Sequence, residues 1–152
     1  NALIRGIASR FKNLGSSLGG LNICISSNVL AGSGLSSSAS FEVLIGTILN
    51  CLYNDRKFTP EELAAIGQYA ENEYFGKPCG LMDQMACAVG GIISIDFKDP
   101  LSPVIEQVNF DFDNQNYKLY RVTVTLLLCS LRRYILYGIF PTFGTIKHSD
   151  VT

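Results

Sequence analysis

The segment GSGLSSSAS at residues 32–40 places glycines and a run of serines directly before an apolar helical pattern. Gly32 and Gly34 allow tight turns and let a ligand approach the backbone closely, because they lack a Cβ atom. The serines at 36–38 supply hydroxyl and N–H groups where a helix start has unpaired donors and a positive dipole. The segment therefore predicts a phosphate-binding loop, although a serine N-cap alone is the ordinary explanation of a shorter run.

The residues after this loop have the period of an amphipathic helix. Apolar side chains recur at intervals of three and four positions, which is typical of one buried helix face. They are Phe41, Leu44, Ile45, Ile48, Leu49 and Leu52. We expect a helix over residues 37–53 that buries this face and holds the N–H groups of the loop in place.

A second helix is predicted over residues 60–74. Thr59 as N-cap, Pro60 at the first helical position and Glu62 three residues after the cap form a capping box. The buried face is expected to continue through Leu63, Ile66, Ala70 and Tyr74, and Gly76 and Pro78 are expected to end the helix.

Two carboxylates near the end of this region suggest chemistry. Glu71 lies in the last turns of the predicted helix, where the dipole disfavours a negative charge, so we expect a cation near it. Asp83 stands between Met82 and Gln84 in an apolar stretch, and a carboxylate in such surroundings requires a partner or a function. A solvent-exposed glutamate remains the simpler explanation of Glu71.

Two strings together carry a resemblance to a known family. GSGLSSSASFEV at residues 32–43 and AENEYFGKPCGLMDQ at residues 70–84 resemble the galactokinases, which are GHMP small-molecule kinases. The first string is similar to the superfamily as a whole, including homoserine and mevalonate kinases. The second is more specific, because a cysteine–glycine–aliphatic–Met-Asp-Gln run is the galactokinase form. The likeness extends from Leu3 to about Leu119.

The resemblance implies a role for each matching residue. The ATP-binding loop corresponds to Gly32, Ser33, Gly34, Leu35, Ser36, Ser37 and Ser38. Ser38 and Glu71 correspond to the hydroxyl and the carboxylate that hold Mg²⁺, an ion that takes few protein oxygens beside phosphates and water. Asp83 corresponds to the catalytic base at the sugar's C1 hydroxyl, and Gly80 to the loop that shapes the sugar pocket, so both are implied substrate-binding residues.

The implied reaction is transfer of a phosphoryl group from ATP to D-galactose, giving galactose 1-phosphate and ADP. Because the transition state of this reaction is loose, the protein catalyses it mainly by positioning the reactants and neutralising charge. Two alternatives stay open: a galactokinase-like sensor that binds ATP and galactose without catalysis, and a kinase for N-acetylgalactosamine. The serine run 36–39, SSSA, is intact, which favours the enzyme over the sensor.

The chain also departs from the family pattern. The family's N-terminal G-R-x-N-L-I-G-E-H signature and its C-terminal half have no counterpart, so we expect residues 1–119 to be the central part of a longer kinase domain and to be inactive alone. Residues 120–146 are expected to be an apolar insertion or an artefact of the gene sequence, with a genuine extra hairpin as the alternative. Residues 147–152 resemble the family again.

The expected fold class is α+β, a partial GHMP-kinase fold with a mixed or antiparallel sheet packed on helices. The remaining predicted elements are a helix over residues 1–13 with Leu3, Ile4, Ile7 and Phe11 on one face, and strands near residues 21–27, 91–97, 103–110 and 117–127.

Composition indicates a soluble globular protein, and the family resemblance implies that its partners are small-molecule substrates. Charged residues make up 16% of the 152 residues and the formal net charge is −1, which gives no electrostatic case for a nucleic-acid or membrane partner. The ten residues from Val122 to Leu131, interrupted by Thr123, Thr125 and Ser130, are too few for a membrane span. Five cysteines without a C-x-x-C pair favour a reducing cytoplasm. We expect the full-length enzyme to be a monomer.

Overall fold

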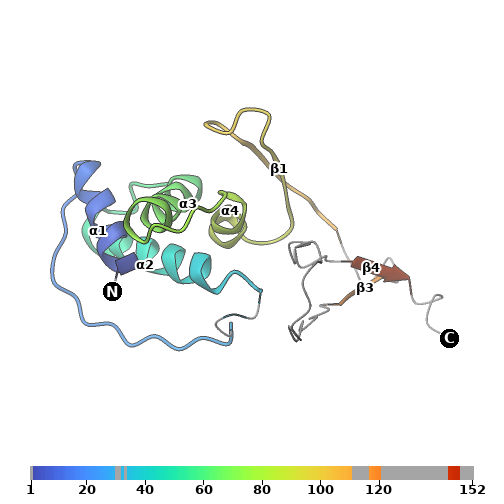
Figure 1. The fold of residues 1–152 in the computed structure, drawn as a ribbon, viewed down its shortest axis with the longest axis horizontal. Coiled ribbons are helices and arrows are strands. Elements are labelled where there is room, and N and C mark those ends of the chain that lie inside the picture. Colours follow the sequence, from blue (N-terminus) through green and yellow to red (C-terminus); the bar gives the residue numbers. More distant parts are fainter. Residues whose placement is uncertain (1, 30–31, 33, 111–116, 121–143, 148–152) are drawn as a thin grey trace, which may run out of the picture. The chain divides into compact units, whose positions relative to one another are not determined.

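A computed structural model of the chain describes residues 2–29, 32, 34–110, 117–120 and 144–147 (Figure 1). The chain divides into two compact units, Asn1–Val108 and Asn109–Thr152. The described part of the first unit consists of helices and one β-hairpin, and that of the second is a pair of short strands. The described residues are therefore of the α+β class.

The helices agree closely with the sequence predictions. They are α1 (Ala2–Asn13), α2 (Ser37–Tyr53), α3 (Pro60–Tyr69), the π-helical turn η1 (Ala70–Tyr74) and α4 (Met82–Val89). The bounds predicted for α2 are confirmed, those for α1 differ by one residue, and the helix predicted over residues 60–74 is present as α3 followed by η1. Helix α4 was not predicted from the sequence.

The start of α3 is fixed by the predicted capping box. Glu62 N–H donates to the hydroxyl of Thr59 at 3.3 Å, and Thr59 N–H donates to the carboxylate of Glu62 at 2.8 Å. These bonds satisfy donors that a helix start would otherwise leave unpaired. Pro60 occupies the first turn, as predicted.

The end of this helix differs from the prediction. The N–H of Phe75 donates to the carbonyl of Ala70, five residues earlier, at 3.1 Å, so the last turn is wider than an α-helical turn. Single π-helical turns are rare and occur often at functional sites. Glu71 lies inside η1 and is buried, so this turn places a carboxylate in the interior of the helical unit.

The hydrophobic core lies between α1, α2 and α3, which pack against one another, with η1 against α1 (Figure 1). Its buried members are Ile7, Phe11, Ile45, Leu49, Phe58, Leu63, Ile66 and Ala70. The predicted faces are only partly correct, since Leu44 is 40% and Leu52 59% exposed, and Ile4 and Tyr74 are exposed as well. Helices α1, α3 and α4 all contact α2. The buried side of α2 therefore includes residues outside the predicted apolar stripe, such as Glu42, Val43 and Asn50.

A glycine allows α1 to approach η1 closely. A Cβ atom at Gly6 would lie 2.8 Å from the Cβ of Ala70 and 2.9 Å from that of Tyr74, which is closer than real side chains come. Gly6 is therefore required for this packing, because it allows the π-helical turn that carries Glu71 to lie directly against α1.

The strand predicted near residues 21–27 is wrong for the structure as described. Residues 16–27 have no regular secondary structure, and Leu21, Ile23 and Ile25 are each between 36% and 39% exposed. The alternating pattern is that of a strand, but no described segment pairs with it. A strand without a partner cannot satisfy its backbone hydrogen bonds within the protein.

The described strands form two antiparallel pairs. Strand β1 (Ile93–Asp96) pairs with β2 (Val104–Gln107), with Ile93 opposite Gln107, which confirms two of the predicted strands at shorter lengths. Strand β3 (Tyr117–Tyr120) pairs with β4 (Gly144–Lys147) in the second unit. Among the described residues both two-stranded sheets are antiparallel, which is one of the two arrangements that the sequence predicts.

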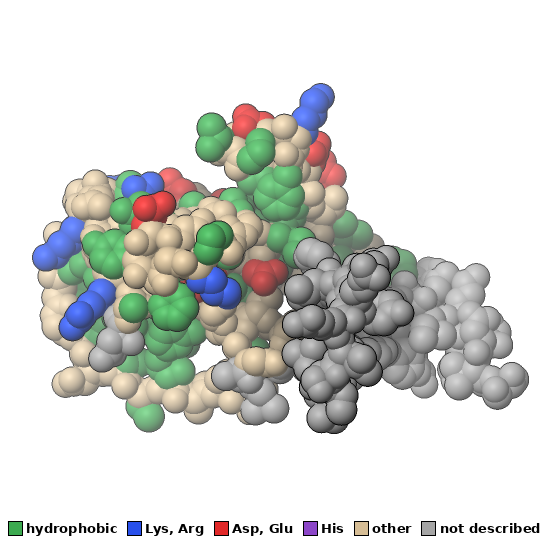
Figure 2. All heavy atoms as spheres, viewed as in Figure 1, with side chains coloured by type: hydrophobic (Ala, Val, Ile, Leu, Met, Phe, Trp, Pro, Cys, Tyr) green, Lys and Arg blue, Asp and Glu red, His purple; other side chains and the backbone are tan. Residues whose placement is uncertain are grey.

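Several sequence predictions fall on residues outside the described part. These are Ser33, the segment 121–143, which includes most of the expected insertion, and the end 148–152. Strand β4 spans residue 146, where the predicted insertion was expected to end. The predicted limits of the kinase segment and the insertion stay predictions. None of the described helices is long and apolar enough to cross a membrane. Figure 2 shows apolar side chains interspersed with basic ones on the surface of the helical unit.

Candidate functional site

The predicted phosphate loop leads into α2 with an unusual backbone. Gly32 and Gly34 both have a φ of 73°, and Ser36, the N-cap, has a φ of 57°. Such left-handed conformations suit glycine and are uncommon for serine. No side chain among the described residues caps the helix at Ser36, so the N–H groups of the first turn are left for another acceptor.

Ser38 and Glu71 are both expected at the metal site, and the Ser38 hydroxyl is among the groups that lower the pKa of the Glu71 carboxyl group. Glu71 is 2% exposed, and burial alone would raise the pKa of its carboxyl group. The pKa is nevertheless lowered, because hydrogen bonds from Lys77, Cys79 and Ser38 and the positive charge of Lys77 stabilise the carboxylate. The first turn of α2 and the π-helical turn η1 thus present a hydroxyl and an ionised carboxylate to each other.

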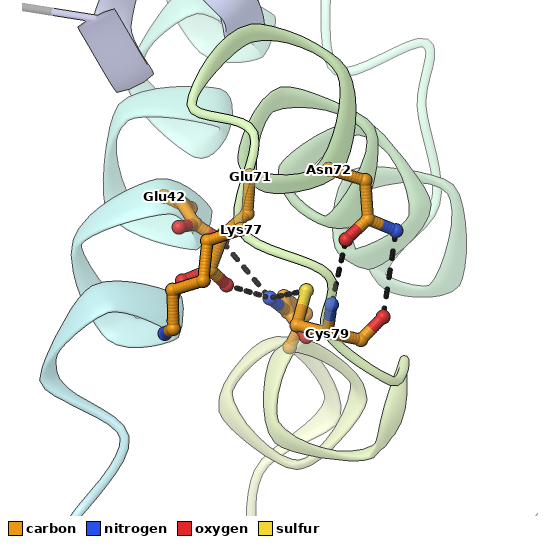
Figure 3. A network of polar contacts seen from close by, with 6 residues as sticks. Glu42, Glu71, Asn72, Lys77 and Cys79 are labelled. Atoms are coloured by element: carbon orange, nitrogen blue, oxygen red, sulfur yellow. Dashed lines mark hydrogen bonds and ion pairs between the residues drawn. The ribbon is translucent and has the colours of Figure 1, made fainter.

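The cation expected near Glu71 is Lys77. Its Nζ atom donates to Oε1 of Glu71 at 2.7 Å, and the lysine side chain is 58% exposed while that of Glu71 is 3% exposed (Figure 3). This ion pair raises the pKa of Lys77. One carboxylate oxygen of Glu71 is therefore directed at a positive charge near the surface.

Asn72 holds the segment that follows η1. The N–H of Cys79 donates to Oδ1 of Asn72 at 2.7 Å, and Nδ2 of Asn72 donates to the carbonyl of Cys79 at 3.4 Å (Figure 3). Gln68 on α3 donates to the same carbonyl at 3.2 Å. Burial raises the pKa of the Cys79 thiol to about 11, so it is protonated at neutral pH. These bonds fix the backbone immediately before Gly80, which is exposed.

Two buried residues at this site were not identified from the sequence. Glu42 on α2 and Gln84 on α4 are each 1% exposed. Nε2 of Gln84 donates to Oε2 of Glu42 at 3.0 Å and to Oε2 of Glu71 at 3.1 Å. Burial raises the pKa of Glu42 to about 7, against the opposing effect of the hydrogen bond from Gln84. The signal for Glu42 was its position three residues before Ile45, on the buried face of α2.

Space for these side chains comes from a glycine on α3. A Cβ atom at Gly67 would lie 3.1 Å from Cβ and 3.3 Å from Oε2 of Glu42, and 3.4 Å from Cγ of Gln84. Any other residue would press on both side chains. Helices α2, α3 and α4 and the turn η1 therefore meet around a polar cluster of Glu42, Glu71 and Gln84.

Asp83, the predicted base, is exposed on the first turn of α4. The expectation of apolar surroundings is wrong: the helix turns the neighbouring Gln84 and Met85 inward and leaves Asp83 at the surface. It makes no hydrogen bond to another described residue, whereas Gln84, next to it in the chain, is tied to Glu71. The exposed carboxylate of Asp83 is therefore adjacent in sequence to Gln84, a member of the buried polar cluster.

The donors at Ser38 and Glu71 suit a hard divalent cation such as Mg²⁺. Both would bind through oxygen, and a Mg²⁺ site commonly uses one or two protein ligands beside phosphates. The ammonium group of Lys77 against Glu71 indicates that this carboxylate attracts positive charge. Within the described part of the chain, no group of three or more His, Cys, Asp or Glu side chains is arranged to hold a metal.

Comparison with known proteins identifies the family. Residues 2–91 match the GHMP kinases N terminal domain, and this match covers more than half of the chain. A galactokinase from Clostridium tetani (strain Massachusetts / E88) is 45% identical over 86 residues, which are 57% of this chain and 22% of that protein. The chain thus spans about a fifth of the length of this curated relative. By the extent of the family match, the chain belongs to the GHMP kinases, and within them it is similar to galactokinase.

Proposed function

We propose that this chain supplies the phosphate-binding and metal-binding part of a sugar kinase that phosphorylates D-galactose at its C1 hydroxyl, with ATP as phosphoryl donor. The observation that carries the proposal is the buried carboxylate of Glu71 in η1, ion-paired with Lys77 at 2.7 Å, in a chain whose residues 2–91 match the GHMP kinases N terminal domain. The similarity to a galactokinase supports galactose as the substrate.

The loop at residues 32–38 binds the phosphates of ATP in this proposal. Gly32 and Gly34 turn the backbone with positive φ, and the uncapped N–H groups of α2 would donate hydrogen bonds to the negatively charged phosphate oxygens. Helix α2 is anchored in the core through Ile45 and Leu49, so the N–H groups of its first turn would be held in place before a ligand binds. Preformed donors lower the cost of ordering the site when charge develops on the transferred group.

Ser38 and Glu71 would hold Mg²⁺ through a hydroxyl and a carboxylate oxygen. When bound, the ion neutralises charge on the phosphates of ATP and helps to orient them. Glu71 is suited to this task because its lowered pKa keeps it ionised at neutral pH. Lys77 contacts Oε1 of Glu71, so Mg²⁺ would compete with its ammonium group for this oxygen.

Asp83 is the proposed base. Its exposed position on α4 makes it accessible to a substrate hydroxyl, whose proton it accepts as the new bond to phosphorus forms. Gly80, also exposed and preceded by the segment that Asn72 fixes, would border the sugar. We further propose a cytoplasmic enzyme that is monomeric when full length.

The test is a coupled ADP-release assay on the full-length product of the encoding gene, with ATP, Mg²⁺ and a panel of galactose, N-acetylgalactosamine, glucose and mevalonate. Turnover on galactose alone supports the proposal, and turnover on N-acetylgalactosamine changes the substrate but not the chemistry. Binding of ATP and galactose by calorimetry without turnover would replace the enzyme with a sensor.

The metal assignment is tested in the same assay. Glu71→Gln removes the negative charge but keeps the size of the side chain, so we expect the Mg²⁺ concentration for half-maximal rate to rise at least about tenfold. Glu73→Gln is the matched control, because Glu73 lies in the same turn but is exposed. An unchanged Mg²⁺ requirement in Glu71→Gln would remove Glu71 from the metal site.

A further inference from the structure

We propose that Gln84, supported by Glu42, is a positioning residue that orients the carboxylate of Glu71 for metal binding. The inference rests on the metal site of the proposed function and adds two residues that do not themselves contact the metal. Residues that hold a metal ligand through hydrogen bonds affect metal affinity strongly, because a ligand in the wrong orientation must be reorganised at a cost.

The two oxygens of Glu71 have different partners. Oε2 accepts a hydrogen bond from Nε2 of Gln84 at 3.1 Å, in the interior, and Oε1 contacts Nζ of Lys77 at 2.7 Å. Gln84 is 1% exposed, whereas the lysine side chain is 58% exposed. One oxygen is thus fixed by a buried amide, and the other faces a cation on a flexible, accessible side chain. A carboxylate held in this way can exchange its cation without changing its orientation.

Glu42 determines which way the amide of Gln84 points. An amide nitrogen carries two hydrogens, and here it has two carboxylate acceptors, Oε2 of Glu71 and Oε2 of Glu42, the latter at 3.0 Å, with the sulfur of Cys79 at 3.6 Å as a weaker third acceptor. Reversing the amide would place its oxygen against both carboxyl groups and lose both bonds. Glu42 therefore selects the orientation in which Gln84 donates to Glu71.

Burying the polar cluster of Glu42, Glu71 and Gln84 lowers the stability of the folded protein more than apolar packing at the same place would. Burying a carboxyl group costs free energy unless its atoms are paired, yet Oε1 of Glu42 and Oε1 of Gln84 are buried with no hydrogen-bond partner among the described residues. Gly67, which lacks a Cβ atom, provides the room for both side chains. A chain that required only packing here would be more stable with apolar side chains, as is common for buried polar pairs.

The experiment measures metal affinity directly on the full-length gene product. Mn²⁺, which binds oxygen ligands and is visible by electron paramagnetic resonance, is titrated in the presence of a non-hydrolysable ATP analogue. The variants are Gln84→Met, which keeps the size of the side chain without its donors, Gln84→Ala, Glu42→Ala, the double variant Glu42→Ala/Gln84→Met, and Glu42→Gln. Thermal unfolding establishes that each variant is folded.

The matched control is Asn50→Ala. Asn50 is a buried polar residue on the same helix as Glu42, 3% exposed, but its amide bonds to the backbone of Phe58 and not to the cluster. Its loss should lower the melting temperature and leave the Mn²⁺ affinity unchanged. A variant that acts only through stability would behave in the same way.

We expect Gln84→Met to weaken Mn²⁺ binding by about 10- to 100-fold, the range typical of residues that orient a metal ligand. Glu42→Ala should weaken it less. The double variant should match Gln84→Met, since Glu42 acts through Gln84. Glu42→Gln should bind Mn²⁺ nearly as the wild type does, because its amide oxygen can still accept the bond from Gln84.

The results separate this inference from the proposed function. Wild-type Mn²⁺ affinity in folded Gln84→Met and Gln84→Ala variants would overturn the positioning role while leaving the kinase proposal intact. Weakened binding in these variants together with a wild-type protein that phosphorylates no sugar would support the positioning role and overturn the kinase. A wild-type protein that binds no Mn²⁺ with the nucleotide would overturn both.

Discussion

Lys77 and Glu71 form an ion pair of 2.7 Å between Nζ and Oε1, in which the carboxylate is buried and the lysine side chain is largely exposed. The lowered pKa of Glu71 follows in part from this contact. The pair joins the π-helical turn to the segment that leads toward Gly80. A cation already present at the proposed metal ligand has consequences that can be measured.

Lys77→Met should increase the affinity of the full-length protein for Mn²⁺ in the absence of nucleotide. The ammonium group competes for Oε1 of Glu71, and a partly exposed ion pair contributes about 1 kcal/mol or less, so we expect an increase of about two- to fivefold. Lys57→Met is the control, because Lys57 contacts the ring of Phe58 and not the cluster. Weaker Mn²⁺ binding in Lys77→Met would mean that the lysine assists the metal and does not compete with it.

Stability should fall as pH rises between about 4.5 and 7 because of Glu42. Burial raises the pKa of Glu42 from 4.5 to about 7, so in this window the folded state holds a proton that the unfolded state has released. The free energy of unfolding then decreases with pH, by at most about 3 kcal/mol in total. Urea unfolding at several pH values measures this effect, and Glu42→Gln should remove it.

The effect of Glu71 has the opposite sign and lies at lower pH. Its pKa is lowered on folding, so its contribution to stability is present above the unfolded value of 4.5 and is lost as pH falls through the folded value. The two groups can therefore be distinguished by their windows. A stability that rises between pH 4.5 and 7 in the wild type, and also in Glu42→Gln, would contradict the assignment to Glu42.

Asn50→Ala should destabilise the protein by about 2–3 kcal/mol. The side-chain amide donates to the carbonyl of Phe58 at 2.9 Å and accepts from its N–H at 3.1 Å, and all of these groups are buried. Alanine would leave a buried donor and acceptor of the backbone unpaired. Chemical denaturation measures the loss, and a change below about 0.5 kcal/mol would show that water replaces the amide.

Local signals made most of the helices predictable. The capping box at Thr59 and Glu62 and the apolar period after residue 40 gave the bounds of α2 and α3 to within a turn. Helix α4 was missed because it has only eight residues, follows a glycine and buries only Gln84 and Met85. The strand near residues 21–27 failed because alternation describes a side-chain pattern, whereas a strand also requires a partner.

Only those residues of the candidate site that belong to a family sequence motif could be predicted. The pairing of Ser38 with Glu71 came from a family resemblance and stays a prediction, although the Ser38 hydroxyl helps to lower the pKa of the Glu71 carboxyl group. The bridge from Gln84 to Glu42 could not be predicted, because it joins α2 to α4 through side chains that are far apart in sequence. Asp83 was expected in apolar surroundings, but α4 turns Gln84 and Met85 inward and leaves Asp83 exposed on the other side of the helix.

The central claim is that this chain belongs to an enzyme that phosphorylates galactose at C1, and phosphorus NMR of the reaction tests it most directly. The full-length gene product is incubated with ATP, Mg²⁺ and D-galactose, beside an Asp83→Asn variant that keeps the fold. We predict a phosphomonoester whose phosphorus couples to the anomeric proton and accumulates with ADP in the wild type, and a rate at least about 100-fold lower in Asp83→Asn. Intact ATP with the wild type, or a phosphate on another hydroxyl, would contradict the account.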